Sequence, residues 1–191
     1  MKKLFSFLFI ITSFATFSQT LEGLKADTKK MYDASYTMDF ENVLNYTHPK
    51  VFETVTREQM IQALNDSFEN ENFKIRLVHE NPTFTFSELK KIDDKTLCII
   101  TYTNAIRMTL VEKVTPEKAE ILLNSFKQSN EYKTLIFEKE RNSFFLEGKA
   151  TMIAVAEEST KNEWKFVNYT SSKEKMAESI LGENVMKTLG F

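Results

Sequence analysis

The sequence has few of the residues that restrain or interrupt a chain: one cysteine, three prolines and four glycines among 191 residues. With Cys98 alone, no intramolecular disulfide can form, so stability has to come from a hydrophobic core. Twelve of the seventeen phenylalanines follow residue 18 and are available for that core. Cys98 lies in the apolar run LCIITY, which predicts a buried, unreactive thiol.

Motifs of common enzyme and cofactor sites are also missing. There is no G-x-S-x-G elbow, no H-E-x-x-H motif and no glycine-rich phosphate loop. The two histidines, His48 and His79, have no second ligand at metal-binding spacing. We therefore expect neither a metal nor an organic cofactor, and we expect His48, which precedes Pro49, to be a polar loop residue.

A concentration of positive charge is absent as well. Lysine and arginine total 25, aspartate and glutamate total 27, and the formal net charge is −2. No basic block stands out, so the sequence has no electrostatic sign of a nucleic-acid partner.

The first eighteen residues have the layout of a secretory signal peptide. Two lysines precede an apolar run over residues 4–17, and small residues fit cleavage between Ser18 and Gln19. The run is shorter than the ~20 residues that span a bilayer, so no membrane anchor is expected after cleavage. The sequence thus predicts an exported protein, periplasmic or secreted, with one domain over residues 19–191.

Helical periodicity dominates the first part of this domain. Amphipathic spacing predicts helices over residues 21–38, 40–46 and 57–68. Asp39 is expected to cap the second helix, which we favour over a role as a catalytic acid. Thr56 and Gln59 have the spacing of a capping box at the start of the third.

Alternating hydrophobicity dominates the second part. Strands are expected over residues 73–80, 82–89, 97–111, 132–140, 142–158 and 162–170. A helix over residues 116–130 interrupts them, and a capping box at Ser171 and Glu174 is expected to start a helical tail, residues 171–191, interrupted near Gly182. Helices followed by strands predict an α+β fold in which a curved antiparallel sheet packs on the helices, with bends or bulges in its long strands.

This order of elements resembles the nuclear transport factor 2-like superfamily, a cone-shaped, cystatin-like α+β fold that includes ketosteroid isomerases and polyketide cyclases. The resemblance rests on the Asp39-Phe40 pair at the start of the second helix, the helix REQMIQALNDSF, and the late strand NEWKFVNY. It covers most of residues 21–170. Residues 116–130 and the tail depart from the simplest members, and either segment could cover the open end of the cone or pack on a partner. No catalytic motif of the superfamily aligns.

Five residues are candidates for lining a pocket: Tyr32, Tyr36, His79, Tyr102 and Asn104. The two tyrosines of the first helix are one turn apart, and the alternative is that their rings lie at the edge of the core. His79 falls on the apolar face of its strand, where an imidazole could titrate near neutral pH, although a satisfied strand-end histidine is the simpler reading. Tyr102 and Asn104 share the apolar face of a central strand. A buried amide needs a hydrogen-bond partner, and for Asn104 we expect one within the protein.

The composition favours an exported, non-enzymatic domain that binds a small apolar ligand or a protein partner. An aromatic interior with few convergent polar groups is typical of a binding pocket. One alternative is an acid–base enzyme of the isomerase or cyclase type, which needs a buried carboxyl group with a raised pKa. Another is a module that forms a homodimer through its sheet face.

Overall fold

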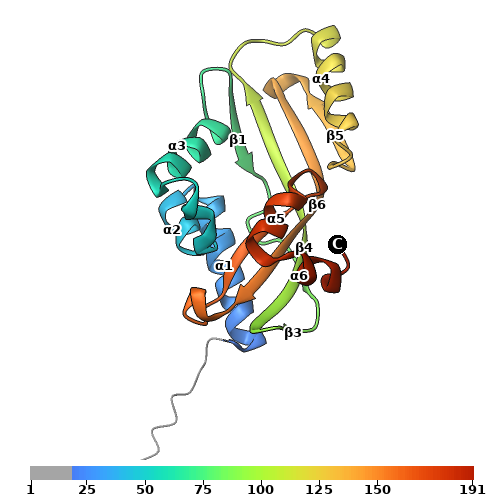
Figure 1. The fold of residues 1–191 in the computed structure, drawn as a ribbon. Coiled ribbons are helices and arrows are strands. Elements are labelled where there is room, and N and C mark those ends of the chain that lie inside the picture. Colours follow the sequence, from blue (N-terminus) through green and yellow to red (C-terminus); the bar gives the residue numbers. More distant parts are fainter. Residues whose placement is uncertain (1–18) are drawn as a thin grey trace, which may run out of the picture.

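A computed structural model describes residues 19–191 of the chain, apart from the side chain of Ser172, so the predicted signal peptide lies outside the described residues. These residues form six α-helices and a seven-stranded antiparallel sheet, which confirms the predicted α+β fold (Figure 1). Two long strands, β4 (Lys95–Leu110) and β6 (Ser143–Ala156), pair with each other along most of the molecule. They form the framework on which the other elements are placed.

Shorter strands complete the sheet along both outer edges. The strands that pair in turn along β4 are β1 (Phe73–Leu77), β2 (Phe84–Phe86) and β3 (Lys90–Ile92), whereas β5 (Thr134–Glu138) and β7 (Lys165–Tyr169) pair with the two ends of β6. The β5 pairing stops at Glu147 of β6, and the β7 pairing starts at Thr151. Residues 148–150 of β6 therefore have no outer partner strand.

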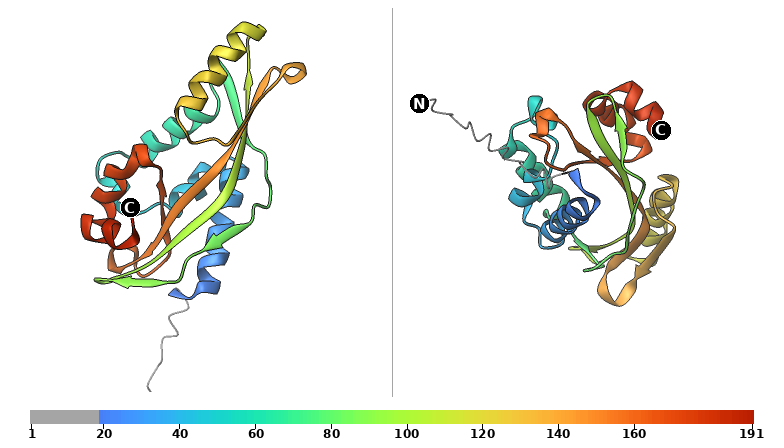
Figure 2. Two further views of the ribbon diagram at one scale, coloured as in Figure 1. Left: turned by 90° about the vertical axis from the view of Figure 1, so that its right-hand side faces the viewer. Right: turned by 90° about the horizontal axis from the view of Figure 1, so that it is seen from below.

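Of the expected bends or bulges, the long strands have bends alone (Figure 2), because the ladder between them contains no β-bulge. Every pair of the β4–β6 ladder, from Thr96 with Ala156 to Thr109 with Ser143, keeps one register. The outer partners change along both strands, so the sheet is at most four strands wide at any level. Such a narrow ribbon can curl by twist alone. Seen from below in Figure 2, it wraps around α1.

Three helices precede the sheet: α1 (Leu21–Tyr36), α2 (Phe40–Asn45) and α3 (Arg57–Phe68). Asp39 caps α2 by accepting a hydrogen bond from the N–H of Asn42, and Thr56 and Gln59 form the predicted capping box of α3. The chain between α2 and α3 includes a 3-10 turn, Pro49–Glu53. Both capping predictions are thus confirmed.

The C-terminal helices cover the opposite face of the sheet from α1, as Figure 2 (left) shows in red and blue. Helices α5 (Glu174–Leu181) and α6 (Glu183–Leu189) pack on odd-numbered strand residues such as Leu97. Gly182, with φ 99°, separates the two helices, as predicted. The predicted capping box is wrong: a 3-10 turn, Ser171–Lys173, occupies the would-be first turn, and α5 begins without a side-chain cap.

Helix α4 (Pro116–Gln128) packs on the same sheet face as α1, but at the other end. Even-numbered residues of β4 pair with even-numbered residues of β6, so their side chains share one face. At one end of that face Ile100 and Met152 belong to the core under α1, and at the other Phe144 and Leu146 pack under α4. The twist of the sheet places the two helices on different sides of the strands in Figure 1. The middle of the face lies between them.

Candidate ligand-binding site

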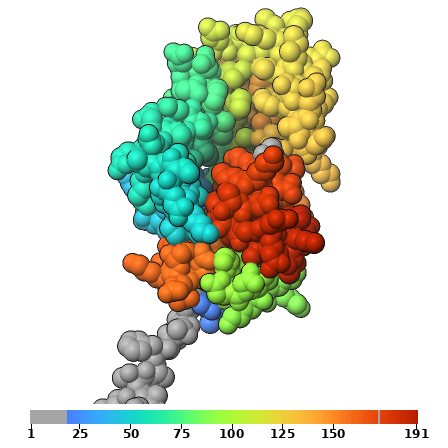
Figure 3. All heavy atoms as spheres, viewed as in Figure 1, coloured from blue at the N-terminus to red at the C-terminus, as the bar shows by residue number. Residues whose placement is uncertain are grey.

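A cavity of about 630 Å³ opens at the middle of the sheet, between the regions covered by α1 and α4. Its floor comes from β4 and β6, through Tyr102, Asn104, Gly148 and Ala150. One wall is the segment between α4 and β5, residues 129–133, and the other is the end of β7 with the residues that lead into α5. In Figure 3, α4 (yellow) lies above the C-terminal helices (red) on one face of the molecule.

Gly148 allows the first of these walls, residues 129–133, to lie close to β6. The carbonyl oxygen of Glu131 lies 2.1 Å from the position that a Cβ atom of residue 148 would occupy. The same segment is held to β6 by the N–H of Lys133, which donates to the carbonyl of Glu147 at 2.7 Å. Because any side chain at position 148 would displace the backbone of Glu131, the glycine determines how close this wall comes to the sheet.

Asn104 lies opposite Gly148 on the cavity floor. Its side-chain oxygen, Oδ1, is buried and accepts no hydrogen bond from residues 19–191. An unpaired buried acceptor costs about 1–3 kcal/mol of stability. The predicted internal hydrogen bond is therefore wrong for this atom. The other partners that a buried amide can use are a water molecule or a ligand.

Tyr102 lies next to Asn104 on the same face of β4 and also lines the cavity. Burial raises the pKa of its hydroxyl to about 12, so the group is neutral near pH 7 and can both donate and accept a hydrogen bond. Its ring contacts those of Tyr32 and Phe84, with centroids 5.6 Å and 5.1 Å away. The three rings form an aromatic cluster that extends from Tyr102, in the cavity lining, towards α1.

Tyr32 lies on the far side of this aromatic group. Its hydroxyl donates to the main-chain carbonyl of His79 at 2.6 Å, and burial raises its pKa to about 12. Together with Phe84, it lines a separate hollow of about 350 Å³ between α1 and β2. Tyr32 thus packs against the ring of Tyr102, and its hydroxyl already makes a hydrogen bond within the protein.

Two of the sequence-predicted residues lie away from the cavity. His79 follows the end of β1, and its Nε2 lies 3.3 Å from Oε2 of Glu147. Glu147 precedes Gly148 in β6, so its side chain points to the opposite face of the sheet. Tyr36, the last residue of α1, is half-buried and lines neither hollow. Of the five candidates, the structure brings only Tyr102 and Asn104 into the cavity.

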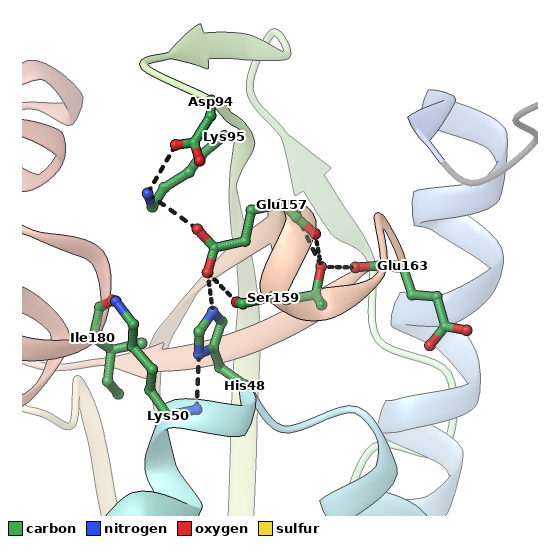
Figure 4. A network of polar contacts seen from close by, with 9 residues as sticks. His48, Lys50, Asp94, Lys95, Glu157, Ser159, Glu163 and Ile180 are labelled. Atoms are coloured by element: carbon green, nitrogen blue, oxygen red, sulfur yellow. Dashed lines mark hydrogen bonds and ion pairs between the residues drawn. The ribbon is translucent and has the colours of Figure 1, made fainter.

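A second polar cluster lies at the C-terminal end of β6 (Figure 4), where His48 and Glu157 are buried, Lys95 is partly buried and Ser159 is exposed. His48 is fully buried, with Nε2 2.9 Å from Oε1 of Glu157. Nδ1 of His48 accepts from the N–H of Lys50, so Nε2 carries the proton. Glu157 also contacts Nζ of Lys95 at 3.0 Å and the hydroxyl of Ser159 at 2.5 Å. The prediction that His48 is a polar loop residue missed these contacts.

The charges of this cluster follow from its hydrogen bonds. Burial disfavours the ionised form of Glu157, but hydrogen bonds from Ser159, Lys95 and His48 outweigh it and lower the pKa to about 2. Burial lowers the pKa of His48, against the opposing effect of Glu157. At neutral pH a neutral imidazole therefore donates to a carboxylate. The cluster joins the chain after α2 to the ends of both long strands, which is a structural role.

The remaining residue patterns give little indication of metal or membrane chemistry. Across residues 19–191 no group of three or more His, Cys, Asp or Glu side chains could hold a metal ion. None of the helices in this range is long and apolar enough to cross a membrane. Cys98 is buried, as predicted, and burial raises the pKa of its thiol. No protein-family model matches the chain, and no curated protein matches it in sequence.

Proposed function

We propose that this domain binds a small molecule in the cavity at Tyr102 and Asn104 and catalyses no reaction. The observation that carries the proposal is the buried Oδ1 of Asn104, which lacks a donor at the floor of an open cavity. A ligand with an O–H or N–H group would supply that donor, and the ring of Tyr102 would contact its apolar part. The expected ligand is thus not purely apolar: it combines a ring or chain with at least one donor.

The resemblance to the nuclear transport factor 2-like superfamily remains a prediction, as does export after cleavage near Ser18. Both fit a binding role. A curved sheet is what the resemblance implies, although the cavity at Tyr102 and Asn104 is walled by residues 129–133 and the end of β7, not by the N-terminal helices. An exported domain of this kind would meet its ligand outside the cytoplasm.

The pKa values of the carboxyl groups favour a binding function over acid–base catalysis. An enzyme of the isomerase or cyclase type needs a buried acid with a raised pKa. Where the pKa of a described carboxyl group is displaced, it is lowered: Glu58, Glu69, Glu117, Glu138 and Glu157. The one carboxylate residue of the cavity lining, Glu131, has an exposed position. Homodimerisation through the sheet face is a separate prediction, which light scattering tests.

The proposal is tested by titrating the ¹⁵N-labelled protein with phenol and with indole, each an aromatic ring with one donor. We expect amide chemical-shift changes centred on Gly148, Ala150 and Asn104, and loss of these changes in Asn104→Leu. Thr103→Val is the control, because Thr103 is exposed on the other face of β4. Equal binding by Asn104→Leu, or shift changes confined to other surfaces, would overturn the proposal.

A further inference from the structure

We propose that the ligand is an N-acylated amino acid, either free or as the C-terminal residue of a peptide, and that it pairs with the main chain of Lys149. This inference rests on the proposed function, because it uses the same cavity. It deepens that function by naming the chemical class of the ligand. The reasons lie in the open edge of β6, in the charges of the lining and in the size of the site.

The gap in the outer edge of β6 leaves one residue unpaired. The carbonyl of Glu147 accepts from Lys133, which lies on the β5 side, so the peptide groups of Glu147 point to the outer edge. In an antiparallel ladder every second residue points the same way, which gives Lys149 and Thr151 the same direction. Thr151 pairs with Tyr169 of β7. Lys149 lies between the two partner strands and pairs with neither.

The N–H and C=O of Lys149 are thus the open hydrogen-bonding groups of this edge. No backbone hydrogen bond joins Lys149 to a residue outside the ladder of the long strands, within the part of the chain that the structure describes. Lys149 is also part of the cavity lining. An exposed N–H and C=O that point the same way form the half of an antiparallel pair that one further residue completes.

An N-acylated amino acid has the matching groups. Its N–H donates to the carbonyl of Lys149, and an oxygen of its carboxylate accepts from the N–H of Lys149. A simple alcohol offers no such matched donor and acceptor at the spacing of a strand residue. The ligand would therefore occupy one strand position between β5 and β7, with its side chain on the face of Lys149. Its acyl group would take the next position, opposite Ala150, on the face of Tyr102 and Asn104, and a donor in that acyl group would serve Oδ1 of Asn104. This is the smallest form of strand addition to a sheet edge.

The charges of the lining favour a free carboxylate. The lining residues include Lys133 and Lys173 against one acid, Glu131, whereas Lys149 contributes its main chain, because its side chain lies on the same face as that of Glu147. None of these lysines is in an ion pair with a carboxylate of residues 19–191. The excess of positive charge around a concave site raises the local concentration of anions.

The size of the site limits the ligand to about one or two residues. The cavity volume, about 630 Å³, is within the range of small-molecule sites. The unpaired stretch of β6, residues 148–150, corresponds to roughly 10 Å of strand. A longer peptide could enter only by its end.

The first test compares three probes on the purified protein by ¹⁵N NMR titration. N-acetyltyrosine is expected to shift the amide signals of Lys149 and Gly148 in a saturable way. The matching ester has an oxygen atom in place of the amide N–H and keeps the free carboxylate. We expect it to bind about tenfold more weakly, because one hydrogen bond is lost and its oxygen faces the carbonyl of Lys149. N-acetyltyrosinamide, which lacks the negative charge, is expected to bind several-fold more weakly. Equal affinities of N-acetyltyrosine and the ester would overturn the inference.

The second test changes the protein. Lys149→Pro removes the outward N–H, which the ladder with β4 does not use, whereas Lys149→Ala keeps that N–H and removes the charge. We expect Lys149→Ala to retain most of the affinity for N-acetyltyrosine and Lys149→Pro to lose at least tenfold. Equal affinities of the two variants would contradict the role of the N–H. If Lys149→Pro does not fold, the ester comparison on the natural chain decides alone.

Failure of this inference is distinguishable from failure of the proposed function. If phenol or indole perturbs the cavity and N-acetyltyrosine does not, the amino-acid class is wrong and the small-molecule site stands. If no probe perturbs the cavity, both fail.

Discussion

Two polar clusters occur on the same pair of long strands and differ in how completely their hydrogen bonds are used. At one end of β6, His48 and Glu157 are buried, and Glu157 contacts both His48 and the partly buried Lys95. At its middle, Asn104 has a buried oxygen without a donor among residues 19–191, and Lys149 has main-chain groups without a strand partner in the same range. Both clusters use ordinary polar residues, so residue type does not tell them apart.

The difference indicates which cluster holds the fold together and which is open to a ligand. A buried network whose donors and acceptors are all paired fixes the elements that contribute to it. A buried acceptor left unpaired costs stability, and such a group calls for a partner outside the chain. Removing a polar side chain should therefore lower stability at the closed cluster of His48 and Glu157 and should not lower it at the open one.

The largest expected effect is at the closed cluster. In Glu157→Gln, Lys95 and His48 lose their carboxylate partner in a buried site, and we expect the free energy of unfolding to fall by about 3–5 kcal/mol. Urea denaturation measures the change. Glu158→Gln is the matched control, because Glu158 is the next residue and is exposed. Its change should be within about 0.5 kcal/mol. Similar losses in both variants would contradict the structural role of Glu157.

The same cluster should make stability depend on pH. An unfolded histidine titrates near pH 6.5, and an unfolded glutamate titrates near pH 4.3. Both folded pKa values are lower, so the unfolded state binds more protons and stability falls as pH falls, first below about 6.5 through His48 and then below about 4.3 through Glu157. The Glu157 part, from about 4.3 to about 2, corresponds to roughly 3 kcal/mol. Urea midpoints at pH 7, 5.5 and 3 test this. Glu157→Gln should have a shallower dependence between pH 4.5 and 2.5, and parallel curves would contradict the prediction.

Gly148→Ala should have a smaller effect and act on the open cluster. The added methyl group would meet the carbonyl oxygen of Glu131, so the wall formed by residues 129–133 has to move away from β6. We expect a loss of about 1–3 kcal/mol in the free energy of unfolding and altered amide shifts along residues 129–133. Lys149→Ala, at the next and exposed position, is the control and should change stability little. An unchanged wall in Gly148→Ala would show that Gly148 does not set the position of this segment.

Much of the fold could be predicted from local patterns. The caps at Asp39 and Thr56, the long strand that contains Tyr102 and Asn104, and the break at Gly182 each depend on a few neighbouring residues. One local pattern failed, because a 3-10 turn takes the place of the capping box expected at Ser171 and Glu174. How the sheet curls could not be predicted locally: the outer partners of the β4–β6 ladder change along its length, and no single segment encodes this pairing.

The candidate site could be predicted only in part. The alternation of β4 placed Tyr102 and Asn104 on one face, and both line the cavity. The role of Gly148 depends on a segment fifteen or more residues away in the sequence, and it had no local signal. His48 could not be assigned either, because its partner Glu157 is 109 residues away. Contacts between distant segments, rather than residue types, determine which polar groups are closed and which are open.

Asn104→Leu gives the smallest change in stability and the most direct test of the comparison. Leucine has the same branching at Cγ as asparagine and removes the buried oxygen that has no donor among residues 19–191. Replacing an unpaired buried polar group with an apolar one is neutral or stabilising, so we expect the free energy of unfolding to rise by up to about 1 kcal/mol, the reverse of Glu157→Gln. The same variant should lose phenol binding. A stability loss above about 1 kcal/mol would mean that Asn104 is already satisfied within the protein, for instance by a resident water molecule. The open cluster would then be as structural as the closed one.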